Sequence, residues 1–155
     1  MKKILFLIIA IGLTIAKANA QQINIQLWGE NAPIVFQCHT SGTAGDYGKF
    51  TSDQQLEFWE SDNGGIDMRW TAEASYATGR IVNYAYIYHG KREGNKIIFT
   101  TREDGDSMEG SEPEKIDPSY QPYEVTILNP KQVSFDRCTY TKMKMDFSKG
   151  KWVAE

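Results

Sequence analysis

The chain has 155 residues, a formal net charge of −3 and two cysteines. Three of its 17 lysines and arginines (Lys2, Lys3 and Lys17) lie in the first 20 residues, which contain none of the 20 acidic residues, so residues 21–155 have a net charge of −6. Phosphate binding requires clustered basic residues, so this balance argues against a nucleic-acid-binding protein and is compatible with a basic protein partner.

The first 20 residues have the three parts of a cleavable signal peptide. Lys2 and Lys3 are followed by the apolar run Ile4–Ala16, and Ala18-Asn19-Ala20 predicts cleavage after Ala20. The apolar run is shorter than the roughly 20 residues that cross a bilayer. Gln21 stands where a lipoprotein would have cysteine. We therefore expect a bacterial periplasmic or secreted protein that is not a lipoprotein.

The rest of the chain alternates apolar and polar residues with a period of two, between turn-forming residues. This pattern predicts strands and no helix of normal length. The expected strands cover residues 22–28, 34–39, 55–60, 66–72, 81–89, 96–101, 120–128 and 132–141. Between them we expect a Gly/Ser/Thr/Asp loop at 40–48 and turns at Asn63-Gly64-Gly65 and Asn129-Pro130.

Short connections between about eight mostly antiparallel strands favour a meander. We expect a single all-β domain over residues 21–155, either a small barrel or a two-layer sandwich, with an acidic loop at 102–119 and a basic tail at 142–155. The layout resembles that of the calycins, the lipocalin group, which implies a barrel that holds a small ligand. Leu27-Trp28-Gly29 contains the residues of the Gly-x-Trp calycin signature, but in a different order.

The two cysteines, Cys38 and Cys138, are predicted to form one disulfide, because export places them in an oxidising compartment. The bridge would tie an early strand to the last one.

The central hairpin, 66–72 with 81–89, predicts a sheet with two apolar faces. A six-residue loop at 75–80 would place Trp70 opposite Ala85 and Met68 opposite Ile87. One face would then form the core, from Ile66, Met68, Trp70, Ala85 and Ile87. The other would be a candidate binding face, from Tyr84, Tyr86, Tyr88, Arg69, Ile97 and Phe99. Such a second face could be covered by the tail, by a second sheet or by a partner.

Candidate chemistry is sparse. Gly105-Asp106-Ser107-Met108 resembles the Gly-Asp-Ser block of a lipase-like family, without the α/β context and late Asp-x-x-His that the family needs. Asp104 and Asp106 match two ligand positions of a calcium loop, but Met108 and Glu109 break the pattern. His39 and His89 have no ligand-spaced carboxylates, so we expect no metal site, no cofactor and no catalytic residues.

Two functions remain. The first is a non-catalytic binding protein whose barrel holds a small apolar ligand. The second is a periplasmic inhibitor or immunity protein that binds a basic enzyme or toxin. The sequence favours the first on architecture and names neither ligand nor partner.

Overall fold

The computed structural model of the protein describes residues 21–30, 34–106 and 111–155; the predicted signal peptide lies outside them. Apart from one short 3-10 turn at Gly45–Tyr47, the regular structure of these residues is β. The strands are β1 (Val35–Thr43), β2 (Lys49–Glu60), β3 (Ile66–Tyr76), β4 (Ile81–Glu93), β5 (Lys96–Asp104), β6 (Glu114–Lys115), β7 (Glu124–Asn129), β8 (Gln132–Phe135), β9 (Cys138–Asp146) and β10 (Lys151–Ala154).

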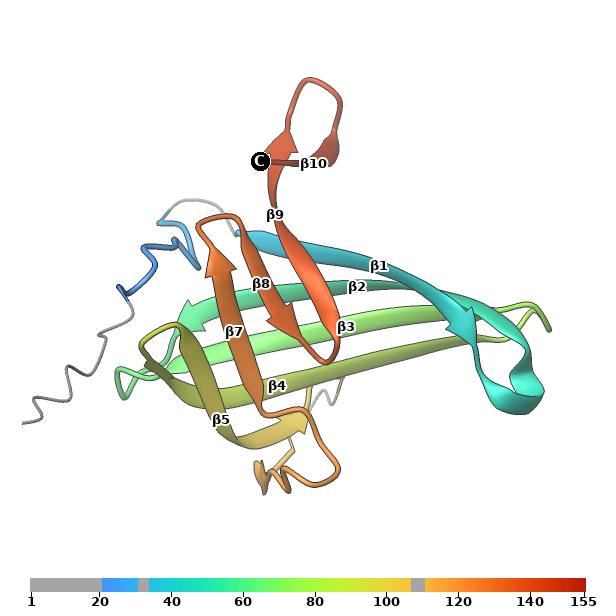
Figure 1. Ribbon diagram of the computed structural model, residues 1–155, viewed down its shortest axis with the longest axis horizontal. Helices are drawn as coiled ribbons and strands as arrows, with labels where there is room; N and C mark the ends of the chain where they lie inside the picture. Colours follow the sequence, from blue (N-terminus) through green and yellow to red (C-terminus); the bar gives the residue numbers. More distant parts are fainter. Residues whose placement is uncertain (1–20, 31–33, 107–110) are drawn as a thin grey trace, which may run out of the picture.

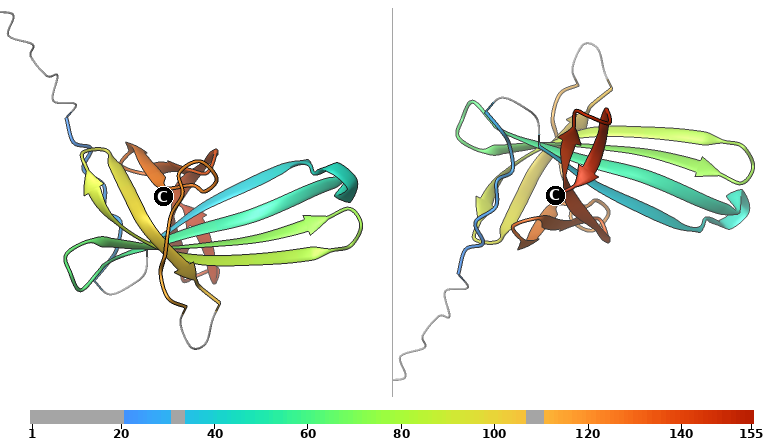
Figure 2. Two further views of the ribbon diagram at one scale, coloured as in Figure 1. Left: turned by 90° about the horizontal axis from the view of Figure 1, so that it is seen from below. Right: turned by 90° about the horizontal axis from the view of Figure 1, so that it is seen from above.

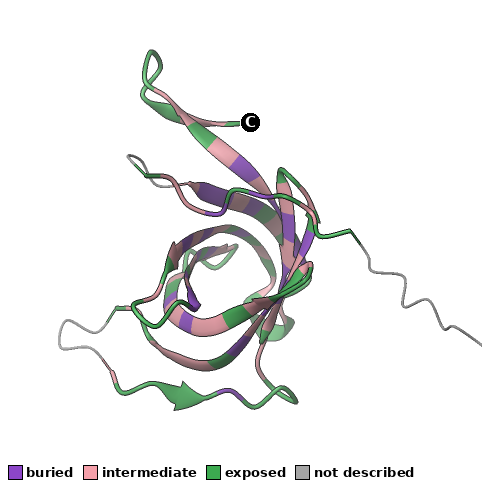
Figure 3. Ribbon diagram, turned by 90° about the vertical axis from the view of Figure 1, so that its left-hand side faces the viewer, coloured by how far each residue is buried: buried purple, intermediate pink, exposed green. Residues whose placement is uncertain are grey.

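The strands form one antiparallel meander that closes on itself. Each strand from β1 to β5 and from β7 to β9 pairs with the next in that series, and β1 also pairs with β9. The predicted all-β meander is confirmed, and the β1–β9 pairing makes it a barrel rather than a sandwich (Figure 3). Strand β6 pairs with β5, and β10 pairs with β9.

Two predicted strands differ from the structure in opposite ways. Residues 22–28 form no strand, yet Ile25 and Leu27 are buried in the barrel as their alternation predicted. Side chains replace the missing ladder, since Asn95 Oδ1 accepts from the Ile23 N–H at 2.7 Å and Arg92 Nη2 donates to the Ile23 carbonyl at 2.6 Å.

The predicted last strand, 132–141, is instead a hairpin of β8 and β9. Its two-residue turn consists of Asp136 and Arg137, whose φ values are 42° and 65°. Such turns normally contain Asn or Gly, so the sequence carried little sign of this one.

Strands β1–β4 extend well beyond the closed ring (Figures 1 and 2). Strand β9 pairs with β1 only at Val35–Gln37, and β5 pairs with β4 only from Tyr86 onward. We call the remainder of these strands, residues 38–43, 49–54, 72–76 and 81–85, the arm. The sequence predicted a loop over residues 40–48 because that segment is rich in Gly, Ser and Thr, whereas β1 continues to Thr43 and β2 begins at Lys49.

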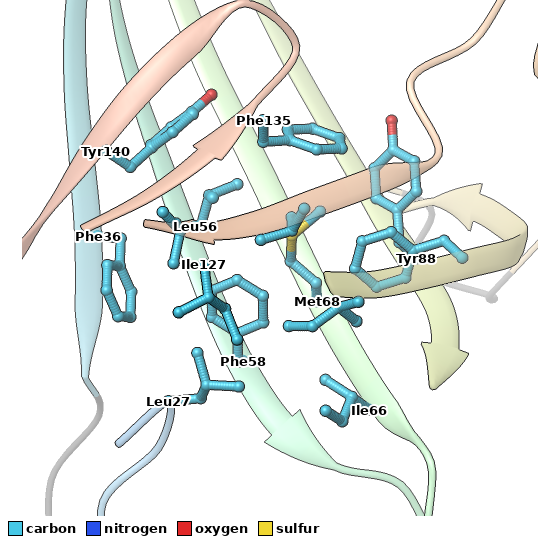
Figure 4. Close-up of a cluster of buried hydrophobic side chains, with 14 of the residues drawn as sticks. Leu27, Phe36, Leu56, Phe58, Ile66, Met68, Tyr88, Ile127, Phe135 and Tyr140 are labelled. Carbon is cyan, nitrogen blue, oxygen red and sulfur yellow. The ribbon is translucent and has the colours of Figure 1, made fainter. Parts of the chain in front are cut away.

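The barrel interior is filled by large side chains, shown in Figure 4. Phe36, Leu56, Met68, Phe135 and Tyr140 are almost completely inaccessible to solvent. Aromatic pairs such as Phe36–Phe58 and Tyr88–Phe135 meet edge to face at centroid distances of 5.7 and 5.4 Å. The first pair joins the adjacent strands β1 and β2, and the second joins β4 to β8 across the barrel.

The predicted disulfide is confirmed: Cys38 and Cys138 are bonded. Cys38 is the first arm residue of β1, and Cys138 is the first residue of β9. The bridge therefore fastens the base of the arm to the barrel at the point where β1 and β9 separate.

Candidate binding surfaces

The predicted division between a core face and a tyrosine face is wrong, because the β3–β4 register differs by one residue. Trp70 pairs with Tyr86 and Met68 with Tyr88, so all four side chains lie on the inner face. Arg69 pairs with Ile87, on the outer face.

The length of the hairpin loop explains the difference. Ser75 pairs with Ile81, which leaves five residues between them rather than six. Within this loop, the Tyr76 N–H donates to the Arg80 carbonyl at 2.9 Å, which leaves a turn of three residues, 77–79. The last of them, Gly79, has a φ of 83°. This three-residue turn with glycine in the left-handed region is a common hairpin connection. Because the loop is one residue shorter than expected, the side chains of β4 exchange faces relative to those of β3.

The candidate residues are accordingly redistributed. Ile66 and Met68 are core residues as predicted, and Tyr88, Ile97 and Phe99 join them rather than forming a binding face. Ala85 is buried, but on the outer face, where Gly105 lies against it. Among the predicted binding-face tyrosines, Tyr84 alone is largely exposed, at 41%.

Trp70 lies at the mouth of the barrel, where the arm begins. Its ring is nearly parallel to those of Tyr84 and Tyr86, with centroid distances of 6.4 and 6.0 Å. Trp70 Nε1 donates to Tyr140 Oη at 3.1 Å, and the Tyr140 hydroxyl donates to Gln54 Oε1 at 2.6 Å. Burial raises the pKa of Tyr140, which keeps this phenol neutral and able to donate. The three side chains close the mouth with a satisfied polar network.

The stacked rings of Tyr84, Trp70 and Tyr86 form an aromatic row, and Arg102 contacts this row at Tyr86. Its guanidinium lies 4.6 Å from the centre of the Tyr86 ring, and its Nε donates to Glu114 Oε1 at 2.7 Å. Burial raises the pKa of the neighbouring Tyr88 phenol to about 12, and Arg102 offsets this in part. The aromatic row is thus held on both sides by hydrogen bonds and a cation–π contact.

The outer face of β1–β4 carries a groove at the base of the arm, which sequence analysis did not find. It crosses β1–β4, has a volume of about 580 Å³, and ends at Asp106 beyond β4 and at Met143 on β9. Two rows of cross-strand neighbours form it; their residues are Gln37, Gln55, Thr71 and Ala85 in one row and His39, Asp53, Glu73 and Asn83 in the other.

The groove is acidic. Asp53, Glu73 and Asp106 line it, and no lysine or arginine is among the described residues that do so. His39 Nδ1 lies 2.7 Å from Asp53 Oδ1. Asp53 and Glu73 are direct partners on adjacent antiparallel strands, a placement of like charges that destabilises a sheet. The alternation of apolar and polar residues in β2 and β3 could have revealed the groove, but only with the β2–β3 register, which pairs Asp53 with Glu73.

His89 lies between two carboxylates elsewhere on the outer face. Its Nδ1 is 3.0 Å from Asp67 Oδ1, and its buried Nε2 is 3.6 Å from Glu103 Oε1. Among the described residues, Nε2 has no hydrogen-bond partner. A histidine-activated nucleophile requires such a bond from a hydroxyl or thiol. The expectation that the protein is not an enzyme stays a prediction.

The acidic loop is shorter than predicted. Arg102–Asp104 belong to β5, and Glu114–Lys115 form β6. Ser107, on which the hydrolase hypothesis depended, and Met108 and Glu109, which break the calcium-loop pattern, lie outside the described residues. Within the described ranges, no group of three His, Cys, Asp or Glu side chains is arranged to hold a metal ion.

Comparison of the chain with protein-family models, curated proteins and solved structures found no match. The described residues contain no helix long and apolar enough to cross a membrane.

Proposed function

We propose that the protein is an exported, non-catalytic binding protein that engages a basic protein partner through the outer groove of its arm. The proposal selects the second of the two functions that the sequence left open. One observation carries it: Asp53 and Glu73 face each other in a groove that no lysine or arginine of the described residues lines.

The charge arrangement favours a binding role over a structural one. Two carboxylates opposed across a sheet weaken folding, and a partner that places Lys or Arg between them would remove the repulsion. Desolvated charge pairs of this kind supply specificity in protein interfaces. Residues 21–155 as a whole have a net charge of −6, which would also attract a basic partner over longer distances.

The arm offers backbone groups as well as side chains. Residues 38–43 of β1 have no ladder partner in β9, and residues 81–85 of β4 have none in β5. An extended segment of a partner can add to such an edge. The arm is also stiffened at its tip, where Tyr76 contacts Tyr47 and Phe50 at centroid distances of 5.5 and 5.9 Å. A stiff arm loses little conformational entropy on binding.

The barrel interior supports the apolar-ligand alternative less well. Its centre is occupied by Tyr88, Phe135, Met68 and Leu56, each nearly inaccessible to solvent. A ligand there would have to displace packed side chains. An apolar ligand stays a prediction, while the open groove supports a surface partner.

The test compares two charge-matched double variants. Asp53→Asn/Glu73→Gln neutralises the groove, and Glu60→Gln/Asp62→Asn makes the same change in net charge at the other end of β2, where both side chains are exposed. Binding is measured by calorimetry against a panel of basic secreted enzymes, lysozyme and ribonuclease among them, at low and high salt.

We expect the groove variant to weaken binding at least about tenfold, the effect of losing one interfacial charge contact, while its melting temperature stays the same or rises. The control variant should bind like the parent protein. Equal losses in both variants, or no binding to any member of the panel at low salt, would refute the proposal.

A further inference from the structure

The last two strands form a hairpin that leaves the body of the protein. Beyond Met143, strand β9 pairs only with β10 in the described structure. Figures 1 and 3 show this hairpin, residues 143–154, projecting away from the barrel in a direction different from that of the arm. The sequence predicted only a basic tail here.

The hairpin is amphipathic. Met145 pairs with Trp152 and Met143 with Ala154, which puts these apolar side chains on one face. Lys144 and Lys151 lie on the other face with Val153 and Asp146, since strand residues alternate. The apolar face lines a hollow of about 460 Å³ together with Ile34 and Phe147, and the charged Lys142, Lys144 and Glu155 also border this hollow.

Phe147 lies in the turn at the end of the hairpin and is 86% exposed. A phenylalanine that stays this exposed gains little from apolar burial on folding. Phe147 extends the half-buried apolar face of Met145 and Trp152 to the turn, where its ring is available for contact with another surface.

The charge of the hairpin is opposite to that of the rest of the protein. Residues 142–155 contain four lysines and two acidic residues, a net charge of +2, whereas residues 21–141 have 10 basic and 18 acidic residues, a net charge of −8. Lys142 pairs with Glu155 at 2.8 Å and Lys149 with Asp146 at 3.3 Å, and Lys131 and Lys144 also lower the pKa of Glu155. Lys144 and Lys151 are exposed and have no carboxylate within salt-bridge distance among the described residues.

We propose that this hairpin attaches the protein to the surface of a bilayer that contains anionic phospholipids. Phe147, Met145 and Trp152 enter the interface between headgroups and acyl chains, and the lysines reach the lipid phosphates with their long side chains. A basic protein partner of the groove would be repelled by the hairpin, whereas an anionic membrane attracts it. The same membrane repels the acidic remainder of the surface, so the molecule approaches hairpin first.

The test uses protein purified after export, with the same verified N-terminus in every variant. Binding is measured as the amount of protein that sediments with lipid vesicles. Vesicles of phosphatidylcholine alone are compared with vesicles that contain phosphatidylglycerol. We expect binding to the anionic vesicles, about tenfold or more stronger than to neutral ones, and loss of this preference at high salt.

Two pairs of variants separate the contributions of the apolar and basic residues. Phe147→Ser should weaken vesicle binding about tenfold without lowering the melting temperature, whereas Tyr120→Ser, at a residue 87% exposed elsewhere, should change neither. Lys144→Gln/Lys151→Gln should remove the preference for anionic lipid, and the charge-matched Lys49→Gln/Lys115→Gln should retain it.

Several outcomes would overturn the proposal. These are no sedimentation with anionic vesicles, equal binding by the Phe147→Ser and parent proteins, or a dimer that Phe147→Ser dissociates in the absence of lipid binding. The groove variant Asp53→Asn/Glu73→Gln should bind vesicles like the parent protein, so failure of either proposal is distinguishable from failure of the other.

Discussion

The two ends of strands β1–β4 share a backbone but carry different inner faces. In the barrel, the inner residues of adjacent strands are large, as in Phe36, Leu56 and Tyr88, and strands β5 and β7–β9 cover them. In the arm, the inner residues between base and tip are small, as in Gly42, Ser52 and Ala74, and in the described structure neither β5 nor β9 pairs there. Larger inner rings occur only at the tip, where Phe50 and Tyr76 meet, and at the base, where Tyr84 stacks on Trp70. Small inner residues thus mark the middle of the arm, which the ring of the barrel does not enclose.

The largest effect is expected when one phenylalanine is truncated in the barrel and one in the arm. Phe135→Ala removes a side chain that is 1% exposed and contacts Trp70, Tyr88 and Phe99, and should lower the free energy of unfolding by about 3–5 kcal/mol. Phe50→Ala, in the arm, removes a half-buried ring and should lower it by about 1 kcal/mol. Urea unfolding of both variants measures the difference. Equal losses would mean that the arm and the barrel are packed alike.

The junction between the two regions is tested through the disulfide. The double variant Cys38→Ser/Cys138→Ser opens a bridge that spans 100 residues, and we expect a loss of about 2–5 kcal/mol, because the unfolded chain regains conformational freedom. Hydrogen exchange should rise more at residues 38–43 than in the β7–β8 hairpin. Uniform acceleration across the chain would show that the bridge stabilises the whole molecule rather than the base of the arm.

A smaller effect is expected from the polar network at the barrel mouth. Tyr140→Phe removes the hydroxyl that accepts from Trp70 Nε1 and donates to Gln54, and should lower stability by about 1–3 kcal/mol. Tyr84→Phe is the matched control, since the Tyr84 ring stacks on Trp70 but is 41% exposed. A loss from the control as large as that from Tyr140→Phe would contradict the role given to the network.

The smallest effect at neutral pH concerns the ionisation of the buried phenols. Burial raises the pKa of Tyr88 from 10.0 to about 12, and it also raises that of Tyr140. Because the folded pKa is higher than the unfolded one, stability from the neutral phenols is fully present below pH 10 and falls as the pH rises toward 12. Tyrosinate absorbance and far-UV circular dichroism, followed together, should show the last ionisations coinciding with unfolding. Complete ionisation with the fold intact would contradict the burial of these two residues.

The sequence by itself determined the β class, the approximate places of most strands and the disulfide. Period-two alternation and turn residues are local properties, so they survive without knowledge of the fold. The Asn63-Gly64 turn and the Asn129-Pro130 turn formed where predicted, between β2 and β3 and between β7 and β8. With two cysteines, the choice of partner was also fixed.

Only the tertiary structure decided which faces became core and which became surfaces. A change of one residue in the turn after Tyr76 moved Trp70 to the same face as Tyr86, and no local pattern specified that loop length. The arm, the acidic groove and the projecting hairpin also depend on where β9 leaves β1 and where β5 leaves β4. These separations follow from closing the barrel around its large side chains, which is a property of strands distant in sequence and therefore absent from any single segment.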